Sequence, residues 1–195
     1  MPVDASDRPD DRFGYSVYAG VLFASQEQQA AVQQLREQIK PRRAMLPAHV
    51  TVKGTFCGTE SLDEVRRLFG EVAAHSAPLE VQIAGRDLHV IKDASSYSIV
   101  KGQALVRLYE ALTAAVGPVC IDAYGYDAGG YQPHLTLWQE CPPENEALAQ
   151  RLARSLHLGK GFTAESVALV GRTGPAHGGR FTTIQSFRLG GTAWR

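Results

Sequence analysis

The chain has 195 residues, of which 44% are hydrophobic, and its 20 basic side chains are balanced by 20 acidic ones. This length permits one sizeable core or two small lobes, and the zero formal charge gives no electrostatic footprint for a long polyanion. No apolar run is long enough to span a membrane and the first residues lack a secretory segment, so we expect a soluble, cytoplasmic protein without a membrane partner.

A tail, a strand and a helix are predicted at the start of the chain. Residues 1–12 are polar and contain two prolines, which predicts a disordered tail, so we expect a single folded domain over residues 13–195. Aromatic and branched residues from Tyr15 to Phe23 predict a first strand. A helix then begins at Ser25, which Gln28 complements as a capping box, and it ends before Pro41.

The middle of the chain predicts another helix and a pair of strands. Ser61 and Glu64 have capping-box spacing ahead of an apolar stripe, which predicts the second helix. Alternating apolar residues follow, and their phase changes near Gly85-Arg86, which predicts a bulge or bend there. The run from Tyr97 to Lys101 is expected to pair back onto this strand.

The second half of the chain repeats the same kinds of element. A third helix with an apolar face of leucines ends at Gly117-Pro118, and a fourth begins at Pro142-Pro143. The leucine stripe of the fourth helix consists of Leu148, Leu152 and Leu156. Two closing strands are predicted at Phe162 to Arg172 and at Phe181 to Leu189.

Corresponding elements of the two halves follow one another in the same order. The matching points are helix starts near 26 and 103, motif strands at 49 and 134, second helices near 62 and 144, and later strands near 81 and 165. A repeated unit of about eighty residues is far longer than a solenoid repeat. We therefore expect an α+β fold with two lobes related by a pseudo-two-fold axis, each with an antiparallel sheet and helices, and an active-site groove between them.

The two halves also share a tetrapeptide of histidine, an apolar residue, threonine and an apolar residue. It occurs as His49-Val50-Thr51-Val52 and as His134-Leu135-Thr136-Leu137, each within a β-prone run, Ala48 to Phe56 and Gln132 to Trp138. With six His and ten Thr in the chain, one copy has no significance, but chance gives two copies with a frequency well below about one in a hundred. Alternate side chains of a strand share a face, so each His lies beside its Thr.

Three further residues are candidates for substrate binding, two of them through strand alternation. Lys53 is expected on the face of His49 and Thr51, where its ammonium group could neutralise phosphate, although an exposed strand-end charge is an equal alternative. Trp138 is expected on the face of His134 and Thr136, where it could stack on a base, with core packing as the alternative. Tyr131 could provide a base platform from the preceding loop.

No metal or cofactor is expected from the sequence. Three cysteines without C-x-x-C spacing argue against a disulfide framework or a zinc site and predict buried free thiols. Neither H-E-x-x-H nor a phosphate-binding glycine loop is present. Paired imidazoles and hydroxyls are by themselves the groups needed for acid-base cleavage of a phosphoester.

The segments PAHVTVKGTF and YQPHLTLW, which contain the two motifs, resemble the two-histidine phosphoesterase superfamily, which includes the 2′-5′ RNA ligase-like proteins and cyclic phosphodiesterases. The resemblance covers about residues 13–195. It implies a bilobal α+β fold and metal-independent cleavage of a cyclic phosphate or a 2′-5′ linkage, with His49, Thr51, His134 and Thr136 as the catalytic set. The implied partner is a small nucleotide or an RNA end carrying such a phosphate.

Several interpretations of the function stay open at the level of sequence. The protein is expected to be a cyclic phosphodiesterase that acts as a monomer without an obligate protein partner. The alternatives are a module that binds a nucleotide or RNA end without chemistry, or a 2′-5′ RNA ligase. Because the two motifs are equivalent, the sequence does not assign the base to one histidine and the acid to the other.

Overall fold

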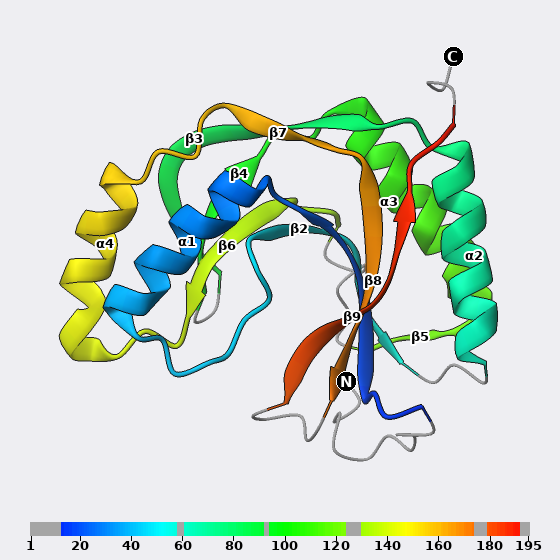
Figure 1. Cartoon of the computed structure of the whole chain (residues 1–195), viewed down its shortest axis with the longest axis horizontal. Coiled ribbons are helices and arrows are strands. Elements are labelled where there is room, and N and C mark those ends of the chain that lie inside the picture. The colour runs from blue at the N-terminus through cyan, green and yellow to red at the C-terminus, as the bar shows by residue number, and fades with distance from the viewer. Residues whose placement is uncertain (1–12, 58–60, 92–93, 124–129, 174–178, 192–195) are drawn as a thin grey trace.

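A computed structural model describes residues 13–57, 61–91, 94–123, 130–173 and 179–191 (Figure 1). In this part of the chain, four α-helices pack on one curled, nine-stranded sheet in which all pairings are antiparallel. The expected α+β class with antiparallel strands is therefore confirmed. The expected disordered tail lies outside the described residues.

The strands follow one another in the sheet in the order β7-β3-β4-β6-β2-β1-β8-β9, and β5 pairs with β2. The two motif strands, β2 and β6, are thus neighbours in the middle of the sheet. The strand bounds are β1 (Val17–Phe23), β2 (His49–Cys57), β3 (Leu79–Ile91), β4 (Ala94–Ile99), β5 (Ile121–Asp122), β6 (His134–Gln139), β7 (Gly161–Ala164), β8 (Ser166–Thr173) and β9 (Arg180–Arg188).

The helices are α1 (Gln26–Ile39), α2 (Leu62–His75), α3 (Gln103–Val116) and α4 (Glu146–Ser155). The capping box predicted for α1 is present, since Ser25 and Gln28 exchange side-chain and backbone hydrogen bonds. Helix α4 contacts the main core through its predicted leucine stripe, whose members are partly buried. Its buried residues are Ala149 and Ala153, while the leucines on either side are only half-buried, because a small residue lets the helix approach the sheet closely.

The helices divide into two pairs that flank the two halves of the sheet (Figure 1). Helices α1 and α4 pack together against β3 and β6, and we call this half, with β4 and β7, the β6 lobe. Helices α2 and α3 pack together against β2, β8 and β9, and this half, with β1, is the β2 lobe. Each lobe thus takes elements from both halves of the sequence, a mixing that the repeat alone does not indicate.

One predicted strand at the C-terminal side was wrong. The run from Phe162 to Arg172 is two strands, β7 and β8, separated at Glu165. Strand β7 pairs with β3 in the β6 lobe, whereas β8 pairs with β1 in the β2 lobe. The chain therefore crosses between the lobes at this point. The phase change predicted near Gly85 is confirmed, because the β3–β4 register shifts between Ile83 and Leu88.

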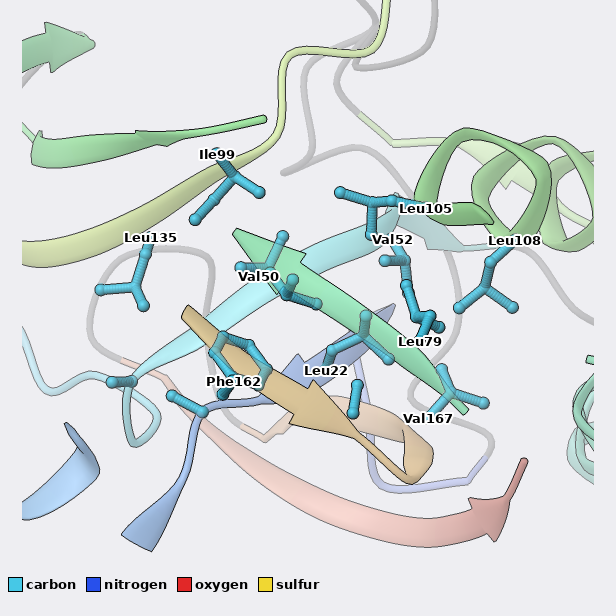
Figure 2. Close-up of a cluster of buried hydrophobic side chains, with 14 of the residues drawn as sticks. Leu22, Val50, Val52, Leu79, Ile99, Leu105, Leu108, Leu135, Phe162 and Val167 are labelled. Carbon is cyan, nitrogen blue, oxygen red and sulfur yellow. The ribbon is translucent and has the colours of Figure 1, made fainter. Parts of the chain in front are cut away.

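A single main core connects the two lobes. It takes side chains from both motif strands, from β1 and β8 of one lobe and from β3, β4 and β7 of the other (Figure 2). Figure 2 shows Val50 and Leu135, whose side chains belong to neighbouring motif strands, within the same cluster. Of the three free cysteines only Cys57 is fully buried. None of the helices in the described ranges is both long and apolar enough for a membrane span.

Candidate active site

The two motif strands meet at one bridge, where Val50 lies opposite Leu135 in antiparallel register. This register puts His49 across from Thr136 and Thr51 across from His134, so the four residues form a square with the histidines on one diagonal. Both Val50 and Leu135 are completely buried in the main core, and so the His and Thr side chains lie on the other face of the sheet.

Both imidazoles are held in the same way by the backbone. The Nδ1 atom of His49 lies 2.8 Å from the carbonyl oxygen of Pro47, and that of His134 lies 2.9 Å from the carbonyl oxygen of Gln132. A carbonyl only accepts hydrogen bonds, so Nδ1 carries the proton in each ring. In each ring Nε2 is therefore the nitrogen left for a substrate, as a base when the ring is neutral and as an acid when it is cationic.

The surroundings of the two histidines differ because their partners on the outer neighbouring strands differ. His49 lies across from Phe23 of β1, whose ring meets the imidazole edge-on with centroids 6.3 Å apart and planes at 73°. Desolvation by burial is the main cause that lowers the pKa of His49 to about 4. The hydrogen bond to Pro47 raises this pKa, and the charges of Arg36 and His134 lower it further. His49 is therefore neutral at pH 7.

The other histidine has hydroxyl groups beside it in place of aromatic carbon. His134 lies across from Ser98 of β4, and Thr136 lies across from Ser96. Ser96 is completely buried and donates a hydrogen bond of 3.3 Å to the Oγ1 atom of Thr136. Thr136 accepts at its oxygen, which leaves its own O–H free to donate toward a substrate.

The structure corrects the expected positions of Lys53 and Trp138. In β2 the pairing steps from Val21↔Thr51 to Gly20↔Lys53, and Val52 is the extra residue of a bulge. In β6 the pairing steps from Ser96↔Thr136 to Ser95↔Trp138, and Leu137 is the extra residue. Each bulge reverses the alternation after the motif threonine, so Lys53 and Trp138 lie on the face opposite the motif side chains.

Both of these residues are buried in the interior. The Cβ atom of Lys53 lies on the side of Gly20 that faces Phe69 of α2, and its Nζ atom is 5.9 Å from the ring centroid of Phe56. Trp138 is 3% exposed within the main core. The structure does not bring either side chain to the motif residues. The burial of Trp138 agrees with core packing, and the burial of Lys53 excludes an exposed strand-end charge.

Tyr131 lies close to the motif strands but faces inward. Its ring stacks on Tyr109 of α3, with centroids 4.2 Å apart and planes at 2°, and its hydroxyl donates a hydrogen bond of 3.1 Å to the backbone carbonyl of Thr51. It is 7% exposed. These contacts position strand β2. Tyr131 is therefore not the exposed platform for a base that the sequence predicted.

Two polar residues at the site were missed by the sequence reasoning. Ser96 belongs to a serine-rich strand that shows no motif. Arg36 of α1 is buried against the backbone of β6, and a signal for it existed, since it follows Val32 by four residues and precedes Ile39 by three on the apolar stripe of its helix. A charged residue on a core stripe requires a buried partner.

Comparison with known proteins agrees with this geometry. A family model described as the 2′-5′ RNA ligase superfamily matches residues 24–176, whereas curated protein sequences gave no match. TT0787 of Thermus thermophilus is 20% identical, with a TM-score of 0.59 over 90% of this chain and 98% of that one. E. coli LigT in complex with 3′-AMP is 13% identical, with a TM-score of 0.55 over 88% of this chain and 96% of that one.

These structures show a shared fold, and the family match extends over both motifs and all four helices. The resemblance found in the two motif segments is thereby confirmed. The chain belongs to the 2′-5′ RNA ligase superfamily, within the two-histidine phosphoesterases.

Proposed function

We propose that the protein is a phosphodiesterase that hydrolyses a 2′,3′-cyclic phosphate, or a related phosphoester of a nucleotide or RNA end, without a metal ion. The observation that carries this proposal is the square of two His-Thr pairs on neighbouring strands, with both Nδ1 atoms held by backbone carbonyls. Two imidazoles and two hydroxyls around one phosphorus atom supply proton transfer in both directions and donors for the developing charge.

The unequal surroundings of the histidines support a role for each. His49 is neutral at pH 7 because burial depresses its pKa, so its Nε2 atom accepts the proton of the attacking water. A cationic His134 donates its Nε2 proton to the leaving ribose oxygen. A phosphorus–oxygen bond to the water oxygen forms and the phosphorus–oxygen bond to one ribose oxygen breaks, so the reaction ends with the water proton on His49 and the His134 proton on the ribose oxygen.

The threonines complete the proposed mechanism by binding the phosphate oxygens. Thr51 and Thr136 each lie across the bridge from the other motif's histidine, so their hydroxyls reach the same phosphate as the imidazoles. Their O–H groups donate to the non-bridging oxygens, where negative charge increases in the transition state. The hydrogen bond from Ser96 favours this donating orientation for Thr136.

A small nucleotide is the ligand class that we infer. E. coli LigT has been solved in complex with 3′-AMP, phosphate, NADP+ and ATP. The balanced charge of this chain also favours a compact ligand over a long polyanion. We further infer a monomeric, cytoplasmic protein without an obligate protein partner, which gel filtration and fractionation of cells test.

Single substitutions of the two histidines test the proposed chemistry. We expect purified protein to open 2′,3′-cyclic nucleotides in the presence of EDTA, and His49→Ala and His134→Ala each to lower the rate by about 10² to 10⁴. His157→Ala is the matched control, since exposed His157 has the same bond from Nδ1 to a backbone carbonyl, that of Ser155, but lies after α4. Full activity in both motif variants would refute the proposal.

The family description, which names RNA ligases, favours ligation as a second candidate. Ligation opens the cyclic phosphate in the same way, with the 5′-hydroxyl of a second RNA end in place of water as the nucleophile. Incubation with two RNA ends, one bearing a 2′,3′-cyclic phosphate and the other a 5′-hydroxyl, separates the two activities by product length. A protein that binds these ends without any turnover, and keeps binding after both histidine substitutions, would instead be a binding module.

A further inference from the structure

The guanidinium of Arg36 is a buried cation that contacts the backbone of both motif segments. Arg36 is 6% exposed, and its three hydrogen bonds all go to backbone carbonyls. Nε donates to Leu137 at 2.7 Å, Nη1 donates to Leu46 at 2.7 Å, and Nη2 donates to Thr136 at 3.1 Å. These carbonyls belong to β6 and to the segment that leads into His49, so one side chain joins both motifs.

Arg36 lies where the two motif strands separate. Strands β2 and β6 share one bridge, at Val50 and Leu135, and beyond it no further pairing between them occurs in the described residues. The carbonyls of Thr136 and Leu137 lie on the next residues of β6 after this bridge, and Leu137 is also the bulged residue. The planar fork of the guanidinium therefore takes the place of the missing ladder bonds, a geometry that an ammonium group does not offer.

The positive charge of Arg36 has no carboxylate within ion-pair distance in the part of the chain that the structure describes. Burial lowers the pKa of Arg36 to about 10, so the guanidinium stays charged at pH 7. Among the described groups, the charges that act on the His49 ring are Arg36 from α1 and His134 from β6, and both disfavour the cationic form of His49. Carbonyl dipoles stabilise a buried cation only in part, so an anion at the neighbouring site is favoured.

We propose that Arg36 is a positioning residue that bridges the two motif strands where they separate and supplies the site with a fixed positive charge for an anionic substrate. The second part rests on the proposed function, whereas the bridging and the effect on His49 do not. The residue acts through the backbone of both motifs and through its field, without contact to the substrate.

Variants that separate the charge from the fork test this proposal. Arg36→Met removes the charge and keeps most of the stem, whereas Arg36→Lys keeps the charge and loses the fork. Arg151→Met on the exposed face of α4 is the matched control. The measurements are the titration of the histidine rings by NMR, the Kd of inorganic phosphate, and kcat on a cyclic nucleotide. The first two do not require turnover, so they still test Arg36 if the proposed activity is absent.

We expect Arg36→Met to raise the titration midpoint of His49 by about half a pH unit or more and to weaken phosphate binding by about fivefold or more. Arg36→Lys should keep phosphate affinity within about threefold and lose kcat by about tenfold or more, because the bridge is lost. A folded Arg36→Met with unchanged His49 titration and phosphate affinity would overturn the proposal. If that variant does not fold, a folded Arg36→Lys with unchanged kcat and unchanged amide shifts at Thr136 and Leu137 overturns it.

Discussion

At the scale of single residues, two identical motifs have become unequal through the side chains across from them. Phe23 and Val21 of β1 face His49 and Thr51, whereas Ser98 and Ser96 of β4 face His134 and Thr136. An apolar neighbour removes water from around the ring and disfavours the imidazolium form, whereas hydroxyl neighbours leave the ring in polar surroundings. The proposed assignment of base and acid thus depends on the side chains of β1 and β4.

The pH dependence of the reaction follows from the environment of His49. Since burial lowers the pKa of His49 to about 4, its ring stays neutral from neutral pH down to that value, and loss of the base begins only as pH falls through about 4. We therefore expect the acid limb of kcat/KM near pH 4 in place of the ordinary value near 6.5. Initial rates, with enzyme pre-incubated at each pH and returned to neutrality as a stability control, measure this limb.

Phe23→Ser is the matched variant for this pH profile. It gives His49 the kind of neighbour that His134 already has, so the pKa of His49 should rise and the acid limb should move toward neutral pH. An acid limb near pH 6.5 in the unmodified protein would contradict the assignment of His49 as the base.

At the scale of elements, both motif strands carry a bulge at the fourth motif residue. The bulged residues Val52 and Leu137 are completely buried, and the His and Thr side chains lie on the opposite face. They also direct Lys53 and Trp138 into the interior, which removes two large side chains from the face that holds the motif His and Thr residues. Bulges beside active sites commonly redirect side chains in this way.

The attachment of β7 to the edge of β3 depends on one glycine. Gly161 has φ of +154°, and a Cβ there would come within 2.0 Å of the carbonyl oxygen of Val81 on the partner strand. We expect Gly161→Ala to lower the free energy of unfolding by about 2 kcal/mol or more. Gly85→Ala is the control, because Gly85 lies on β3 with nothing within 4 Å of an added Cβ. Urea unfolding of both variants measures the difference, and equal effects would contradict the expectation.

At the scale of the whole molecule, the two lobes share elements and a core. The β2 lobe needs β8 from the second half of the sequence, and the β6 lobe needs β3 and α1 from the first half. The main core includes side chains from both motif strands and all four helices. Neither half of the sequence can bury its apolar faces alone, which supports one domain over residues 13–195.

This shared core predicts cooperative unfolding. We expect one thermal transition, with calorimetric and van't Hoff enthalpies that agree, because the main core takes side chains from both lobes and the other buried clusters of the described residues are small. The separate fragments 13–92 and 94–195 should each lack a fixed fold by circular dichroism. Two resolved transitions would show that the lobes are independent domains, and a folded fragment would show that one part of the sequence folds without the other.

Local patterns in the sequence indicated the class of fold and the candidate catalytic residues. Side-chain alternation placed each His beside its Thr, capping residues marked the start of α1, and a phase change located the irregularity in β3. Each of these depends on residues only a few positions apart, so a single chain displays them.

The tertiary structure alone decided which strands pair and therefore what each motif faces. Three features depend on partners that are far away in the sequence. They are the exchange of strands between lobes, the bulges that turn Lys53 and Trp138 inward, and the burial of Arg36 under both motifs. An alternation pattern gives the face of a residue only while the register is unbroken. The sequence therefore predicted the candidate reacting groups, while the packing of β1, β4 and α1 around them keeps the imidazole of His49 neutral at pH 7 and leaves that of His134 in polar surroundings.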